Sequence, residues 1–228
     1  MPVPRATYLA RPAMAVTAEA ATVGAIPQTF IVASDGTFRG ELGDFQHLRG
    51  ALVVAPDGAV SLVGDCSMTT PDGTTSTLTL TGTLTNGRMV GTSSAGDFDL
   101  AVTTLQDQPV DLPSKAGSYR TTSSSNGFTC VITIRPDGSI RGWAYATPEA
   151  ADIGKTPVGA YTGSISYTDP TRNCFNIGFQ FLPDGVGSPL PSTYGLAYFT
   201  PDGGIVALTA NHLNPKAGQW SATFTKVP

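Results

Sequence analysis

Short stretches in which apolar and polar residues alternate run along most of the chain. The clearest is 77–85, Thr-Leu-Thr-Leu-Thr-Gly-Thr-Leu-Thr, where leucine or glycine takes every even position and threonine every odd one. Successive side chains of a β-strand point to opposite faces, so this pattern predicts a strand with leucine on a core and threonine outside. Comparable segments predict about 13 or 14 strands in all.

Tight-turn sequences separate these segments. Pro-Asp-Gly begins at Pro56, Pro71, Pro136, Pro183 and Pro201, and the related pairs are Asp35-Gly36, Asn86-Gly87 and Asn126-Gly127. Proline presets φ for the first turn position, aspartate bonds to its own backbone, and glycine accepts the positive φ that closes a hairpin. Hairpins join antiparallel neighbours. The predicted fold class is therefore all-β, with antiparallel, hairpin-rich sandwich or barrel modules.

Segments of the first half recur in the second half at a nearly constant offset. The pairs are 36–39 with 117–120, 53–60 with 133–140, and 80–84 with 161–165, at offsets of 81, 80 and 81 residues. A fourth pair, 96–103 with 218–225, has an offset of 122 residues. This self-similarity predicts two related copies, the second carrying an insertion near 173–214.

The expected organisation is an N-terminal arm followed by two β-modules. The segments are the arm 1–27, the first module 28–107, a proline-containing linker 108–114 and the second module 115–228. One continuous barrel or sandwich is the alternative. A plain arm is the favoured interpretation of 1–27, and a vestigial secretion signal is the other. We expect no membrane-spanning helix, because no stretch approaches about 18 consecutive apolar residues.

Composition and charge narrow the function classes. Only 13% of the residues are charged, against roughly 25% in typical globular proteins, and the formal net charge is −4. Long helices need Glu, Lys and Gln on their surfaces, so a coiled coil is excluded. A strongly basic nucleic-acid-binding protein is excluded as well, because this chain has a net negative charge and nucleic acid is a polyanion.

The three cysteines predict neither a disulfide framework nor a zinc site. Cys66 continues the apolar face of Val60 and Leu62, Cys130 lies on the apolar face of its segment, and Cys174 lies on the polar face of its own. A Cys130–Cys174 bridge would need a bulge to turn one side chain around, so no disulfide is expected. No C-x-x-C spacing is present, and no metal or other cofactor is predicted.

Catalytic templates find no match. The two histidines, His47 and His212, have no ligand spacing, and most aspartates belong to turns. The remaining carboxylates, Glu41, Asp44 and Glu149, are not paired by any sequence pattern, and Asp97-x-Asp99 lacks the loop that Ca²⁺ ligation needs. We predict no catalytic residue and expect that the protein is not an enzyme.

One aromatic cluster is a candidate contact site. In 139–146 the small or apolar residues Ile140, Gly142, Ala144 and Ala146 share one face. Arg141, Trp143 and Tyr145 then project from the other, with the composition of an interface hot spot or a sugar-stacking platform. Cover by the insertion or by the other module is the alternative. The row of phenylalanines and isoleucine in 175–181 is expected to be core, as are Tyr194 and Tyr198, which share the face of Leu196.

These features predict a non-enzymatic structural or adhesive β-protein exposed on a virion, of the decoration, tail or fibre type, or on a cell surface. The expected partners are further copies of the chain, other structural proteins of an assembly, or surface glycans, and not nucleic acid. The alternatives are a secreted carbohydrate-binding module and a hydrolase on a β-scaffold, whose residues would come from distant strands.

Overall fold

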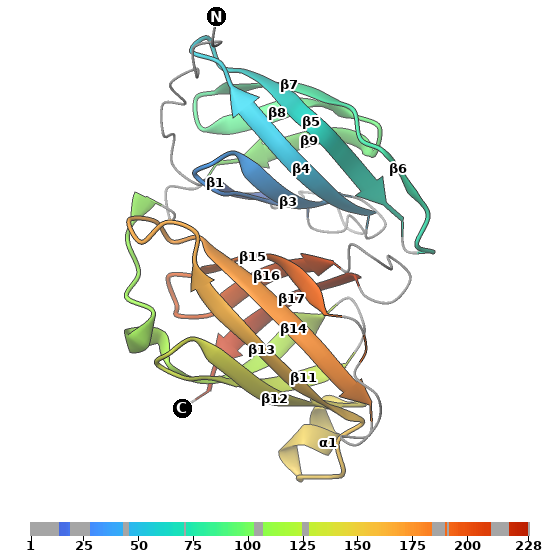
Figure 1. The fold of residues 1–228 in the computed structure, drawn as a ribbon, viewed down its shortest axis with the longest axis vertical. Coiled ribbons are helices and arrows are strands. Elements are labelled where there is room, and N and C mark those ends of the chain that lie inside the picture. Colours follow the sequence, from blue (N-terminus) through green and yellow to red (C-terminus); the bar gives the residue numbers. More distant parts are fainter. Residues whose placement is uncertain are drawn as a thin grey trace, which may run out of the picture.

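The structure is a computed structural model, and it describes residues 14–18, 28–42, 46–70, 72–102, 107–124, 128–183, 190, 192–210 and 219–227. Nearly all of them belong to antiparallel strands, which confirms the predicted all-β class (Figure 1). The strands are β1 (Met14–Ala18), β2 (Gln28–Val32), β3 (Thr37–Leu42), β4 (Gln46–Val54), β5 (Ala59–Thr69), β6 (Thr75–Thr77), β7 (Leu80–Thr85), β8 (Arg88–Ser93), β9 (Gly96–Ala101), β10 (Gly117–Ser124), β11 (Thr129–Ile134), β12 (Ser139–Tyr145), β13 (Gly159–Tyr167), β14 (Phe175–Pro183), β15 (Thr193–Phe199), β16 (Ile205–Ala210) and β17 (Gln219–Lys226). Among the described residues there is one α-helix, α1 (Pro148–Asp152), and one short 3₁₀ helix, η2 (Pro113–Lys115).

The first module is a nearly closed sheet. Its strands follow the order β1-β2-β3-β4-β5-β7-β8-β9, and β6 pairs with β5 outside this path. β1 comes from the segment expected to be an arm and pairs antiparallel with β2 from Met14 opposite Val32 to Ala18 opposite Gln28. β1 also lies near β9, so the two ends of the sheet approach each other.

The second module is a closed barrel of the eight strands β10 to β17. Each strand pairs with the next, and β17 returns to pair with β10. Part of the expected insertion, 173–214, supplies β14, β15 and β16. The expected linker 108–114 runs into η2 and packs the buried Leu112 against the barrel core, and the Leu112 N–H donates to the hydroxyl of Tyr167 at 2.7 Å.

The two rings match strand by strand over the first three sequence repeats. β3, β4, β5 and β7 occupy the consecutive positions that β10, β11, β12 and β13 occupy in the barrel. The fourth repeat pairs β9 with β17, which differ in position: β17 neighbours β10, as β2 neighbours β3. The first module thus takes two of its ring strands from before the matched region, and the second takes them from after it.

Five hairpins share one turn geometry. In 55–59, the Gly58 N–H donates to the carbonyl of Ala55, and the Ala55 N–H donates to the carbonyl of Ala59. The Asp57 carboxylate accepts the Ala59 N–H at 3.0 Å. The same backbone and carboxylate bonds recur around Asp35, Asp72, Asp137 and Asp202. This is the type I turn with a following glycine in the left-handed region. The turn expected at Asn126 lies outside the described residues, and of the turn expected at Pro183 only Pro183 itself, the last residue of β14, is described.

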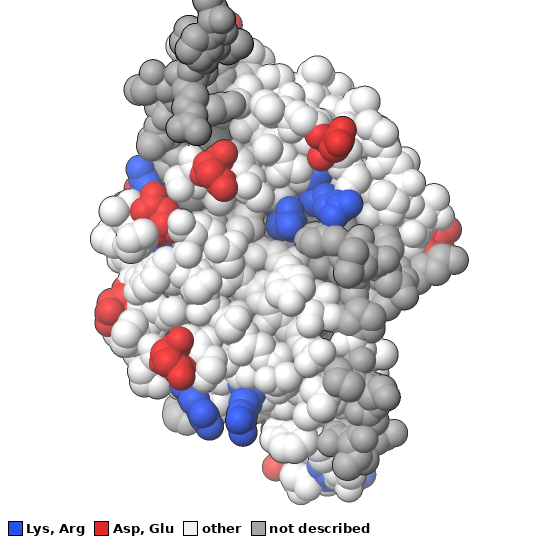
Figure 2. All heavy atoms as spheres, viewed as in Figure 1, with Lys and Arg blue, Asp and Glu red and all other residues white. Residues whose placement is uncertain are grey.

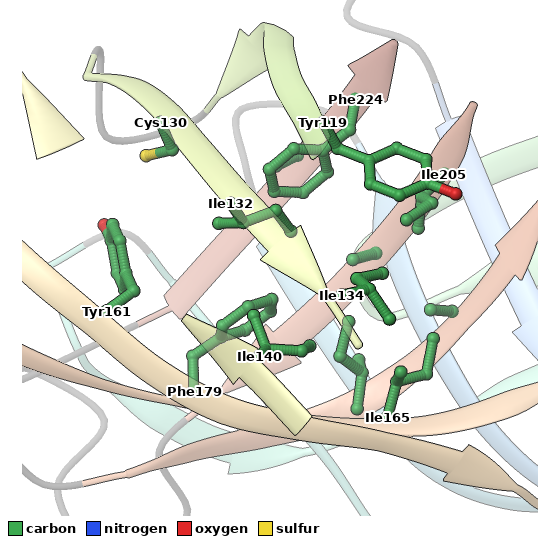
Figure 3. Close-up of a cluster of buried hydrophobic side chains, with 14 of the residues drawn as sticks. Tyr119, Cys130, Ile132, Ile134, Ile140, Tyr161, Ile165, Phe179, Ile205 and Phe224 are labelled. Atoms are coloured by element: carbon green, nitrogen blue, oxygen red, sulfur yellow. The ribbon is translucent and has the colours of Figure 1, made fainter. Parts of the chain in front are cut away.

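Each module has its own apolar core. In the first, the rings of Phe30 and Phe38 stack with their centroids 5.6 Å apart, and Phe98 packs beside them. The barrel interior is filled by aromatic and branched side chains, including Tyr119, Ile132, Ile165, Phe179 and Phe224 (Figure 3).

A third apolar cluster joins the modules. It contains Ile31 and Ala33 of the first module and, from the outside of the barrel, Cys174, Leu196, Tyr198 and Leu208. The run Phe30-Ile31-Val32-Ala33 is apolar at every position because alternate residues enter the first core and the inter-module cluster. β2 is therefore buried on both faces, which is the usual reason for a continuous apolar strand.

Candidate contact surface

β12 carries the candidate surface on its outer face. Ile140 and Ala144 are fully buried in the barrel core. Gly142 has a place between them where only glycine fits, because a Cβ there would lie under 3.0 Å from the carbonyl oxygen of Val131. The alternate residues point outward: Arg141 is exposed, Trp143 is 49% exposed and Tyr145 is half-buried.

The residues next to Trp143 on the neighbouring strands have small or only partly exposed side chains. Val131 of β11 lies directly opposite on one side and Ala160 of β13 on the other. Leu182 of β14 continues this row beyond Ala160. Neither direct neighbour is a large aromatic or charged residue, so the indole lies on a shallow apolar strip of the sheet.

Helix α1 lies beside this strip. Its N-terminus is capped by Thr147, whose hydroxyl accepts the Ala150 N–H at 3.2 Å. Arg120, which is opposite Val131 on β10, forms an ion pair with Asp152 and donates to the carbonyl of Pro148 at 2.8 Å. These bonds tie both ends of α1 to the strand next to the strip.

Polar side chains flank Arg141. Thr133 of β11 and Thr162 of β13 lie directly opposite it on the two neighbouring strands, and both are exposed. Arg120 is paired with Asp152, whereas Arg141 has no ion pair within the described residues. Arg141 therefore offers a guanidinium to solvent between two hydroxyl groups.

The first module does not cover this surface. It packs against β15 and β16, and Figure 1 shows β12 and α1 at the end of the barrel away from it. The candidate surface therefore remains exposed in the described structure, although an intramolecular cover was the alternative expectation.

Tyr198 is buried as expected, whereas Tyr194 corrects a prediction. Their face, shared with Leu196, was expected to be core, but it is the outer face of the barrel: the inward residues of β15 are Ala197 and Phe199. Leu196 and Tyr198 are buried because the first module covers them. Tyr194 lies beyond that cover, is 58% exposed, and has its ring against Gly178.

All three cysteines are free and buried. Cys66 lies within 3.5 Å of the carbonyl oxygens of Ala51 and Val63. Cys130 is inside the barrel, on the same side of the cluster as Tyr161 (Figure 3). Cys174, expected on a polar face, points away from the barrel core into the inter-module cluster. Burial raises the pKa values of Cys130 and Cys174 to about 11.

A polar group of the first module was not foreseen. Arg39 lies directly opposite Arg49, and Glu41 lies directly opposite His47, all on the face of β3 and β4 that does not enter the first core. Burial, reinforced by the charge of Arg49, lowers the pKa of Arg39 to about 10. Burial also lowers the pKa of His47 to about 4. Their sequence context contains only alternation, which does not distinguish a covered outer face from a solvated one.

Most other carboxylates have structural contacts. Asp99 forms an ion pair with Arg88 on β8, and Asp97 is exposed on the same face of β9. Hydrogen bonds from Ser139 lower the pKa of Asp137, and the Thr200 hydroxyl lowers that of Asp202. Glu149 is exposed on α1, and Asp44 and His212 lie outside the described residues. No group of three or more potential metal ligands occurs in the part of the chain that the structure describes.

The charged residues are spread thinly. Figure 2 shows them as small separate groups on a largely uncharged face. None of the described helices has the length and apolar character that crossing a membrane requires.

We compared the chain with models of protein families, with curated proteins and with solved structures, and none of the three comparisons found a match.

Proposed function

We propose that the protein is a non-enzymatic structural or adhesive β-protein, exposed on a virion or a cell surface, that binds its partner through the outer face of β12. The observation that carries this proposal is the 49% exposure of Trp143 on a rigid barrel strand. Tryptophan and arginine are the residues most enriched at binding hot spots. Trp143 and Arg141 stand on one strand face, and α1 is tied down beside them.

The architecture supports a scaffolding role. Eight paired strands, with Leu112 packed on the core, hold the backbone of β12 from both sides. A contact surface on such a strand loses little conformational entropy on binding, because its backbone is already fixed. The aspartates of the five described turns each accept a backbone N–H, which supports a structural role for five of the 17 acidic residues.

The test compares Trp143→Ala with Tyr194→Ala, which removes a somewhat more exposed aromatic from another part of the same barrel. Native mass over a concentration series and binding to intact cells or particles are measured for both variants and the unaltered protein. We expect Trp143→Ala to weaken assembly or binding at least about fivefold, and Tyr194→Ala to leave both unchanged. Equal behaviour of the two variants would refute the proposal.

A secreted carbohydrate-binding module is the second candidate. It is favoured by the flat apolar strip around Trp143 next to the exposed hydroxyl groups of Thr133 and Thr162. A sugar ring needs both an apolar platform and nearby hydrogen-bonding groups. Binding to glycans by a protein that remains monomeric at high concentration would favour this candidate.

A further inference from the structure

We infer that the surface formed by Arg141, Trp143, Thr133 and Thr162 binds oligosaccharides that carry a carboxylate, such as sialylated or uronic-acid-containing glycans. This inference rests on the proposed function, because it names the class of partner that the same surface takes.

The apolar part of the surface fits the face of a pyranose ring. Trp143 is bordered in register by Val131 and Ala160, and the small side chain of Ala160 leaves the sheet low on that side of the indole. Aromatic rings pack against the C–H groups of sugars while leaving the sugar hydroxyl groups at the rim.

The hydrogen-bonding part of the surface lies one step along the strands. Arg141 is two residues from Trp143 on the same face, which corresponds to about 6.5–7 Å along a strand, close to the width of one sugar unit. Thr133 and Thr162 extend this polar row to the neighbouring strands. A ring stacked on Trp143 thus has its neighbouring sugar over a guanidinium and two hydroxyl groups.

The charge of the row selects an acidic sugar. The other two arginines of this face have carboxylates nearby: Arg120 pairs with Asp152, and the charge of Arg135 acts on Asp137. Neither Arg135 nor Arg141 has an ion pair among the described residues, and of the two it is Arg141 that lies on β12, opposite Thr133 and Thr162 and two residues from Trp143. Guanidinium groups bind carboxylates through paired, charge-assisted hydrogen bonds, which a neutral sugar does not offer.

The experiment measures binding of the purified full chain to an array of matched acidic and neutral glycans, including 3′-sialyllactose with lactose. Four proteins are compared: the unaltered chain, Trp143→Ala, Arg141→Gln and the control Tyr194→Ala. Circular dichroism and melting temperature verify that each variant is folded. We expect the acidic member of a pair to bind at least about tenfold more tightly than the neutral one. Trp143→Ala should lose binding to both members, and Arg141→Gln should lose only the preference for the acidic one.

The outcomes separate this inference from the proposed function. If acidic glycans bind, Arg141→Gln removes the preference and Tyr194→Ala binds normally, the inference is supported. If neutral glycans bind equally well, or if no glycan binds while Trp143→Ala still impairs assembly, the inference is wrong and the proposed contact surface stands. If Trp143→Ala changes neither glycan binding nor assembly, both are wrong.

Discussion

The backbone of Gly58 meets the backbone of Leu84: the Gly58 carbonyl accepts the Leu84 N–H at 2.8 Å, and a Cβ on Gly58 would lie under 3.0 Å from the Leu84 carbonyl oxygen. Gly138 and Ile165 repeat this relationship in the barrel, with an N–H bond of 2.9 Å. The φ angles of the two glycines are +91° and +81°. Each turn is thus fastened to the strand beyond its own hairpin, at equivalent positions of the two rings.

This close approach predicts different costs for two glycines in the barrel. Gly138 and Gly203 have similar φ angles, +81° and +86°, but a Cβ on Gly203 would meet nothing within 4 Å. We expect Gly203→Ala to lower the free energy of unfolding by about 1–2 kcal/mol through φ strain alone. Gly138→Ala should cost about 1–3 kcal/mol more, because it also forces two backbones apart. Urea denaturation measures both, and equal losses would contradict the prediction.

The inter-module cluster predicts coupled unfolding. Ile31 is fully buried against the barrel, although it belongs to the first module. We expect one thermal transition for the unaltered protein, and a loss of about 2–4 kcal/mol in Ile31→Ala, with the modules beginning to unfold separately. Val63→Ala, at a site 40% exposed on the same module, serves as control. Calorimetry distinguishes the cases, and an Ile31→Ala protein that melts like the Val63→Ala control would show that the modules do not stabilise each other.

The buried thiols predict slow modification. Cys66, Cys130 and Cys174 should all resist a water-soluble thiol reagent at pH 8 in the folded protein and react together in urea. The pKa values of about 11 for Cys130 and Cys174 add to this protection, because the thiolate is the reactive form. Thiol titration and intact mass provide the measurement. A thiol that reacts quickly in the native state would contradict the prediction, as would an intact mass lower by the two hydrogen atoms that are lost when a disulfide forms.

His47 predicts a loss of stability in mild acid. Its pKa is about 4 in the folded chain, because burial disfavours the charged ring, against about 6.5 in an unfolded chain. The unfolded state therefore binds the proton first, and stability falls as the pH drops from about 6.5 to 4. Each pKa unit corresponds to about 1.4 kcal/mol, so the loss approaches about 3 kcal/mol. Above about pH 7 the ring is neutral in both states, so this loss of stability is absent.

The control for this prediction is His47→Gln, which cannot titrate. Glu41, a second titratable group, lies directly opposite His47 on the neighbouring strand, so the quantity to compare is the difference between the two proteins. Chemical denaturation at pH 7.5, 5.5 and 4.5 should show the unaltered protein losing more stability than His47→Gln. Parallel pH profiles would show that folding does not lower the pKa of His47.

Alternation and turn chemistry predicted most of the strands, although the described residues form 17 where about 13 or 14 were expected, and 77–85 holds the end of β6 and all of β7 rather than one strand. The pattern of 77–85 and the repeated Pro-Asp-Gly turns predicted the antiparallel hairpins that the structure contains. Alternation gives the two faces of a strand but does not say what covers each one. Tyr198 and Leu196 looked like core because they are apolar, yet they are on the outside of the barrel, where the first module covers them. Cys174 was expected on the polar face of its segment, yet the first module covers that face at this position as well.

The candidate surface was easier to locate than the polar group on β3 and β4. On β12, the glycine and alanine face can only be the crowded side, so the bulky residues had to point outward. Around Arg39 and His47 the face outside the first core contains residues that are usual at a surface, and their burial depends on segments distant in sequence. No local pattern carries that information.

The order of the ring strands along the chain determines when each module can fold during synthesis. The first ring uses β1 and β2, which precede its other strands, so all of its strands exist once β9 has left the ribosome. The barrel needs β17 to pair with β10, and about 100 residues separate these strands along the chain. On the ribosome, the first module can fold before the barrel, and its apolar face around Ile31 is then available for the barrel to pack against. The barrel must wait for its last strand, and its outer apolar patch is then covered as soon as it forms.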